Sequence, residues 1–96
     1  MKILFSSQAW DEYQDWQRTD KQTLKKINEL IRDIARSPYQ GIGKPEPLKF
    51  ELAGRWSRRI NEEHRIVYEI NGKKEEGKNK KTDRKVLIIH QCKYHY

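Results

Sequence analysis

Two stretches of the chain alternate apolar and polar residues on either side of a short polar turn. In a strand, successive side chains point to opposite faces of the sheet. The apolar residues between positions 56 and 70 that this alternation assigns to the core face are Trp56, Ile60, Ile66, Tyr68 and Ile70. Ile60 and Ile66 share that face only if the turn holds an odd number of residues, because a one-residue slip reverses every side chain. The pattern therefore predicts a β-hairpin whose loop is Asn61-Glu62-Glu63.

The same alternation places two arginines together on the other face of this hairpin. With the predicted loop, Arg59 lies directly across from Arg65. Like charges opposed on neighbouring strands repel each other unless an anion lies between them. The planar guanidinium group matches the geometry of phosphate. The pair therefore indicates a phosphate-containing ligand.

Helical periodicity dominates the first third of the chain. Ser6-Ser7 marks the start of a first helix, with Ser7 as the better N-cap, and this helix ends near Arg18. A second helix follows a cap at Thr19-Asp20 and ends at about Arg36, since the next residue precedes a proline. Two helices joined so tightly form an antiparallel hairpin.

Each predicted helix carries an apolar stripe. In the second helix the stripe consists of Leu24, Ile27, Leu30, Ile31 and Ile34. In the first helix the large apolar residues are the aromatic Trp10, Tyr13 and Trp16. Aromatic residues at helical spacing usually pack in a core, which is our interpretation here, with base stacking as the alternative.

The remaining apolar runs are short and predict strands over residues 2–5, 48–52 and 85–94. The run 86–89 is apolar on both faces, which is typical of a central strand. His90 shares a face with Val86 and Ile88, which favours a structural role. Residues 39–47 read as a loop in which Pro45 and Pro47 stiffen the backbone around Glu46. A carboxylate held in this way suits catalysis, but an ordinary turn with a surface glutamate explains the pattern too.

Composition adds constraints on domain number, location and partners. Ninety-six residues, 34% hydrophobic and 36% charged, make one domain, 1–96, with a charged hairpin-loop insert at about 71–84. The net charge of +7 indicates an anionic partner, nucleic acid or acidic protein, although a solvated basic surface accounts for it equally well. The single cysteine, Cys92, is expected to pack as a small apolar residue. With no membrane-length apolar run and no signal peptide, we expect a soluble cytoplasmic protein.

A set of polar residues suggests a specific reaction. It comprises Glu46, Lys49, Arg59, Arg65, His95 and Tyr96. A carboxylate, a histidine and several cations suit metal-independent RNA cleavage by the RNA's own 2′-hydroxyl, with a base, an acid and charge stabilisation. We find no metal-ligand spacing and no phosphate-binding glycine loop, so we expect no metal and no cofactor. Periodicity supports only the pairing of Arg59 with Arg65.

Four segments, 25–31, 44–49, 56–68 and 93–96, resemble the YoeB (Txe/YoeB) toxins of the RelE superfamily. The resemblance covers nearly the whole chain except the charged insert, where such toxins usually have a shorter turn. It implies an α+β fold with two N-terminal helices packed on a twisted, mainly antiparallel sheet. It also implies a ribosome-dependent endoribonuclease that cuts mRNA in the A site, a cognate antitoxin and a homodimer.

The family's site residues are implied motif by motif. The resemblance makes Glu46 the general base, His95 the general acid and Arg65 the residue that stabilises the transition state. The implied substrate-binding residues are Lys49, Arg59 and Tyr96. From the charge we further expect an acidic antitoxin segment that covers this face or displaces a mobile C-terminus. Two rivals stay open: a non-catalytic ParE-like toxin that binds a protein target, and a small basic nucleic-acid-binding module.

Overall fold

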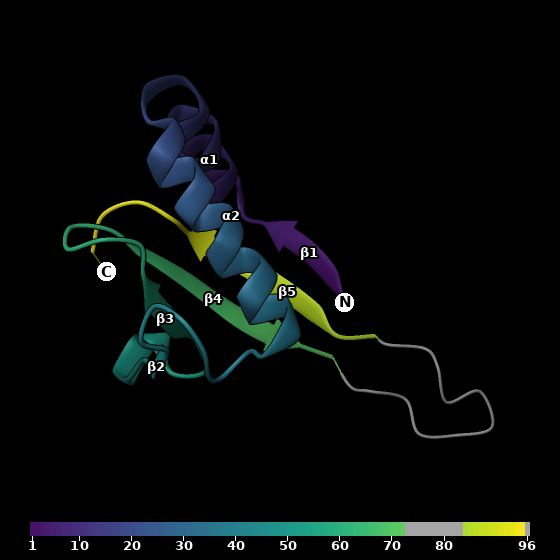
Figure 1. The fold of residues 1–96 in the computed structure, drawn as a ribbon. Coiled ribbons are helices and arrows are strands. Elements are labelled where there is room, and N and C mark those ends of the chain that lie inside the picture. Colours follow the sequence, from purple (N-terminus) through teal and green to yellow (C-terminus); the bar gives the residue numbers. More distant parts are fainter. Residues whose placement is uncertain (73–83, 96) are drawn as a thin grey trace.

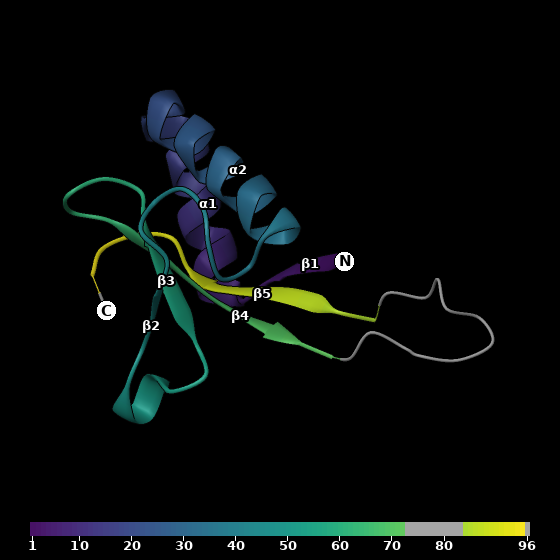
Figure 2. The same cartoon turned by 60° about the horizontal axis from the view of Figure 1, so that its bottom comes forward.

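Two helices and a sheet of five strands make up the part of the chain that the structure describes, residues 1–72 and 84–95 of a computed structural model. In chain order the elements are β1 (Lys2–Phe5), α1 (Ser7–Thr19), α2 (Lys21–Arg36), β2 (Glu46–Pro47), a 3₁₀ helix η1 (Phe50–Leu52), β3 (Trp56–Arg59), β4 (Arg65–Asn71) and β5 (Val86–Gln91). The strand order is β1-β5-β4-β3-β2, with β1 parallel to β5 and the other neighbours antiparallel. Both helices lie on one side of the sheet (Figures 1 and 2). The predicted fold class is confirmed.

Side-chain caps explain the tight junction of the helices. Asp20 accepts a hydrogen bond from the Thr23 amide at 3.1 Å, while its own amide donates to the Trp16 carbonyl at 3.0 Å. One residue therefore ends α1 and begins α2. At the start of α1 the prediction of Ser7 as N-cap is wrong by one residue, because Ser6 has an extended backbone and its Oγ accepts from the Ala9 amide.

The core lies between the helices and one face of the sheet. Ile27, Leu30 and Ile34 of α2 are fully buried, as predicted, and belong to the same cluster as Ile66 and Tyr68 of β4. Leu87 and Ile89 bring β5 into this cluster. The other face of the sheet points away from the helices.

The aromatic stripe of α1 is only partly buried, contrary to its interpretation as core. Trp16 is 7% exposed and belongs to the core, but Trp10 is 46% exposed. Trp10 instead packs against the rings of Phe5 and Tyr13, with centroids 5.6 and 5.9 Å away. Phe5 and Tyr13 pack against the core, and Trp10 packs on these two rings.

Two strand predictions differ from the structure. The expected strand at 48–52 is instead a turn containing η1, because Phe50 has a φ of +58° and the Leu52 amide bonds to the Lys49 carbonyl. The strand in this region is β2, which includes Glu46. The last strand was expected over 85–94 but ends at Gln91, although its central place in the sheet is confirmed.

The charged insert predicted at 71–84 falls largely on residues 73–83, which lie outside the described residues. Neither helix of the described ranges combines the length and apolar character needed to span a bilayer.

Candidate functional site

The β3–β4 hairpin has the predicted register. Arg59 lies opposite Arg65, and Trp56 lies opposite Tyr68. Beyond the paired strands, the Ile60 amide donates to the His64 carbonyl at 3.0 Å, which encloses residues 61–63 as the loop. Asn61 stabilises this loop, because its Oδ1 accepts from the amides of residues 63 and 64.

Strand β2 adds Glu46 to the face that carries the two arginines. Glu46 lies opposite Ser57 of β3, and opposed residues of antiparallel strands point to the same face. Ser57 and Arg59 are two positions apart, so they also share that face. Glu46, Arg59 and Arg65 therefore lie on the face of the sheet turned away from the helices, within a few strand positions of one another.

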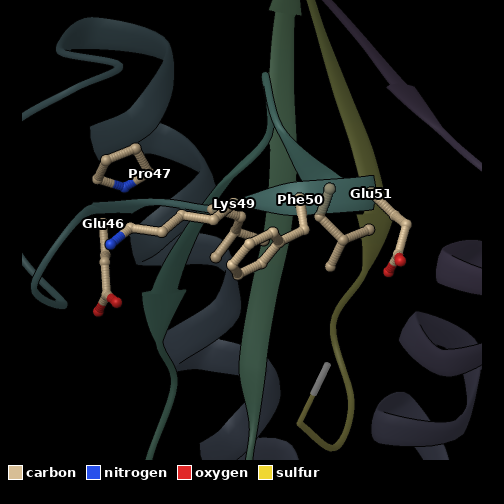
Figure 3. A pocket seen from close by; sticks show the side chains of 7 residues that line it. Glu46, Pro47, Lys49, Phe50 and Glu51 are labelled. Carbon is tan, nitrogen blue, oxygen red and sulfur yellow. The ribbon is translucent and has the colours of Figure 1, made fainter.

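A hollow of about 430 Å³ borders Glu46 and extends along the β2–η1 segment, residues 46–52. Glu46 and Lys49 are both exposed, and their side chains extend toward the same end of the hollow (Figure 3). Glu51 points toward the opposite end, and the Phe50 ring lies between the two ends (Figure 3). The hollow thus exposes a carboxylate next to a lysine.

Arg65 is held firmly rather than extended into solvent. The residue is 9% exposed, and its Nη1 donates to three carbonyls of the hairpin loop: Asn61 at 2.7 Å, Glu62 at 3.2 Å and His64 at 3.1 Å. Carbonyl dipoles around the guanidinium offset part of the repulsion from Arg59, so the pair does not depend on a bound anion alone. Nε and Nη2 are not used in these three bonds.

The C-terminal tail brings His95 to the same end of the sheet. The Arg65 amide donates to the Tyr94 carbonyl at 3.1 Å, and the Tyr94 amide donates to His64 Nδ1 at 2.7 Å. His95, which is exposed, follows directly. Both ribbon views show the tail reaching the side of the β3–β4 loop (Figures 1 and 2). Tyr96 lies outside the described residues.

The tail before His95 is anchored to α1. Trp16 Nε1 donates to the Cys92 carbonyl at 2.9 Å, and the Cys92 amide donates to Glu12 Oε1 at 2.7 Å. The Cys92 thiol is fully buried, as predicted, and burial raises its pKa to about 12. These contacts with α1 divert the chain from β5 and explain why the strand ends at Gln91.

Sequence reasoning missed the buried network behind this face. Arg58 is 0% exposed and donates to Asp33 Oδ2 at 2.5 Å. Its further acceptors are the carbonyls of Ser37, Gln40 and Ile42 and the Tyr68 hydroxyl. The hydrogen bond from Arg58 lowers the pKa of Asp33 below its ordinary value. The sequence contained a signal for this burial, because Arg58 occupies an even position, on the core face between Trp56 and Ile60.

This network fixes the loop that leads to Glu46. Arg58 binds three carbonyls of residues 37–42, and the Arg59 amide donates to the Gly43 carbonyl at 2.7 Å. Gly43 has a φ of +79°, and a Cβ there would lie 2.8 Å from Leu30 Cδ2. The loop is therefore tied to β3 from both sides just before β2 begins.

A second polar pair lies further along the open face. His90 Nε2 and Glu69 Oε1 are 2.6 Å apart, and both side chains are largely buried. Leu87 and Ile89 point into the core, so His90 lies on the opposite face with Val86 and Ile88, as predicted.

Comparisons with known proteins match the chain to one family of toxins. The family model described as "YoeB-like toxin of bacterial type II toxin-antitoxin system" matches residues 5–96. The chain is 52% identical over 96 residues to Toxin YoeB of Escherichia coli K12, covering 100% of both chains. A solved YoeB/ParE toxin from Agrobacterium tumefaciens superposes with a TM-score of 0.88 at 46% identity, again covering 100% of both chains.

Solved structures of Staphylococcus aureus YoeB show that protein as a dimer and in a heterotetrameric complex with YefM antitoxin. Each superposes with a TM-score of 0.80 at 45% identity and covers 100% of this chain and 98% of the other.

Proposed function

Because the chain belongs to the YoeB-like toxins of bacterial type II toxin–antitoxin systems, we propose that it is a ribosome-dependent endoribonuclease that cleaves mRNA in the A site. The proposal is supported by the gathering of Glu46, Arg59 and Arg65 on one open face, and by the hydrogen bond from the Arg65 amide to the carbonyl of Tyr94, the residue before His95. A base, an acid and fixed cations on one surface are what metal-independent cleavage of RNA requires.

Each of these residues has a separate role in the reaction. Glu46 takes the proton of the 2′-hydroxyl, whose oxygen attacks the neighbouring phosphorus. His95 gives a proton to the 5′-oxygen as the P–O5′ bond breaks, which leaves a 2′,3′-cyclic phosphate on the upstream fragment. Arg65 stabilises the charge that develops on the non-bridging oxygens. Substrate contacts come from Lys49, Arg59 and Tyr96.

The environment of Arg65 suits this role. Its three bonds to loop carbonyls fix the guanidinium before substrate arrives, so little reorganisation is needed in the transition state. Its burial excludes water and strengthens its interaction with the developing negative charge. Glu46, by contrast, is exposed and open to an incoming hydroxyl.

The protein partners follow from charge and from the relatives. We propose that an acidic segment of a cognate antitoxin binds the open face, since this chain carries a net charge of +7 and the S. aureus relative forms a complex with its antitoxin. We extend the homodimer of that relative to this chain as well. Acting on translating ribosomes, the protein would work in the cytoplasm.

Primer extension on a reporter mRNA in a translating extract tests the proposal. Wild type should give discrete breaks within A-site codons, and Glu46→Ala, Arg65→Ala and His95→Gln should each remove most of them. Glu51→Ala is the matched control, because Glu51 borders the same hollow as Glu46 but points to its other end (Figure 3). It should retain wild-type cleavage.

Two results would contradict the proposal. Equal cleavage of naked and translated transcripts would contradict ribosome dependence. Intact message in an extract whose translation or replication nevertheless stops would favour a toxin that binds a protein target, and the catalytic assignments would then be withdrawn.

A further inference from the structure

Tyr94, the residue that precedes His95, has an unusual backbone conformation. Its φ is +62°, in the left-handed region that residues with a Cβ seldom occupy. A side chain in this region persists only where its surroundings hold it there. The Tyr94 ring is 61% exposed, and its centroid lies 5.5 Å from that of the His64 ring and 5.3 Å from Lys93 Nζ.

Both backbone polar groups of Tyr94 are bound by two consecutive residues of the hairpin. The Tyr94 amide donates to His64 Nδ1 at 2.7 Å, and its carbonyl accepts from the Arg65 amide at 3.1 Å. These two bonds fix Tyr94 through both its amide and its carbonyl. The turn that they enforce sets the direction in which the chain continues to His95.

His64 is itself fixed. It is 9% exposed, and its ring meets the Trp16 ring edge-on with centroids 4.9 Å apart. Trp16 also binds the Cys92 carbonyl, so the same aromatic residue anchors the histidine and the start of the tail. For Nδ1 to accept an amide hydrogen it must be unprotonated, which places the proton of the neutral ring on Nε2.

We propose that His64 is a positioning residue for the candidate general acid. Its Nδ1 holds Tyr94 in the left-handed turn, and the turn delivers His95 to the side of Arg65. His64 does not touch the RNA in this arrangement. The inference rests on the proposed function in one respect, since it assumes that His95 works in cleavage.

A pair of amide substitutions separates this role from general packing. In His64→Asn the amide oxygen Oδ1 lies two bonds beyond Cβ, as Nδ1 does, so it can accept from the Tyr94 amide. In His64→Gln the amide reaches the place of Nε2 and that acceptor is lost. We expect His64→Asn to keep most of the single-turnover cleavage rate on programmed ribosomes, and His64→Gln to lose about 100-fold with little change in ribosome affinity, the loss typical of a misplaced catalytic group.

Nuclear magnetic resonance provides readouts that do not require activity. In wild type, His64 should be the Nε2-protonated tautomer and the Tyr94 amide should exchange slowly with solvent. The His95 side-chain shifts should move in His64→Gln and stay near wild type in His64→Asn. Melting temperatures of both variants show whether a loss of rate is merely a loss of fold.

The inference is overturned if both variants cleave at the same rate, if His64 Nδ1 carries the proton, or if the Tyr94 amide is unprotected in wild type. If His64→Gln does not fold, the tautomer and amide exchange of wild type still decide it. If wild type does not cleave at all, the proposed function fails, and the positioning of His95 by His64 is then judged on the His95 shifts alone.

Discussion

Arg58→Met tests whether the buried network behind the sheet stabilises the fold. The substitution removes a guanidinium that is 0% exposed and leaves the Asp33 carboxylate, 8% exposed, without its main partner. Three carbonyls of residues 37–42 lose a donor as well. Removing one member of a buried ion pair typically costs about 3–5 kcal/mol. We expect a loss in this range, because Arg36 and the Ile42 amide still bind Asp33 and limit the damage.

The matched control is Arg36→Met. Arg36 binds the same carboxylate, at Oδ1 and 2.5 Å, but its side chain is 78% exposed. Exposed pairs contribute at most about 1 kcal/mol. The two variants therefore remove the same residue type from the same acid and differ mainly in burial.

Urea denaturation followed by circular dichroism gives both free energies of unfolding. A domain of this size has about 5–15 kcal/mol in total, so Arg58→Met should remove a large share of it. At about 4–8 °C per kcal/mol, a loss of about 3–5 kcal/mol should lower its melting temperature by roughly 12–40 °C. Equal and small losses in the two variants would refute the reasoning, since burial would then make no difference.

Three further predictions concern single positions. Gly43→Ala should destabilise more than Gly54→Ala in urea denaturation, because both glycines have positive φ but only at Gly43 does a Cβ meet neighbours; equal losses would show that backbone strain alone matters. The Cys92 thiol should not react with a disulfide reagent in the folded protein and should react fully in denaturant, since its pKa is about 12 and it is buried; rapid labelling without denaturant would contradict this. The pKa of Asp33 is lowered in the folded protein, so the carboxylate contributes fully to stability at pH values above its ordinary pKa of 3.8. This contribution is lost as the pH falls through 3.8 toward the pKa of the folded state, and Asp33→Asn should therefore lose less stability in acid than wild type.

Local periodicity predicted the elements whose core residues are apolar, and it failed where a charged residue is buried. The helices and the β3–β4 register followed from the spacing of apolar positions. Arg58 lies at a core position of the same pattern, but a buried arginine is rare unless it is paired, and its partner Asp33 is 25 residues away. The expected strand at 48–52 failed because nothing in a phenylalanine signals the left-handed φ that Phe50 adopts.

The candidate site depended on contacts between distant parts of the chain. Glu46 joins the arginine pair through the register of a two-residue strand, which the sequence does not specify. The tail leaves β5 because Cys92 binds Glu12, a contact across 80 residues. Apolar spacing carries no information about such bonds. Family resemblance supplied the site residues, and the structure supplied the reason that His95 lies near Arg65.

The two halves of the candidate site have separate anchors, and this separation is testable. Arg58 and His64 face the helices, whereas their neighbours Arg59 and Arg65 belong to the open face. Arg58 binds the loop that leads to Glu46, and His64 binds the tail that leads to His95, with no hydrogen-bond partner in common. Sites without shared partners act nearly independently. In hydrogen exchange, Arg58→Met should therefore expose the amides of residues 37–43 and leave that of residue 94 protected, and His64→Gln should do the reverse. Loss of protection in both regions in either variant would mean that one cooperative unit holds the whole site, and the separate-anchor reasoning would be wrong.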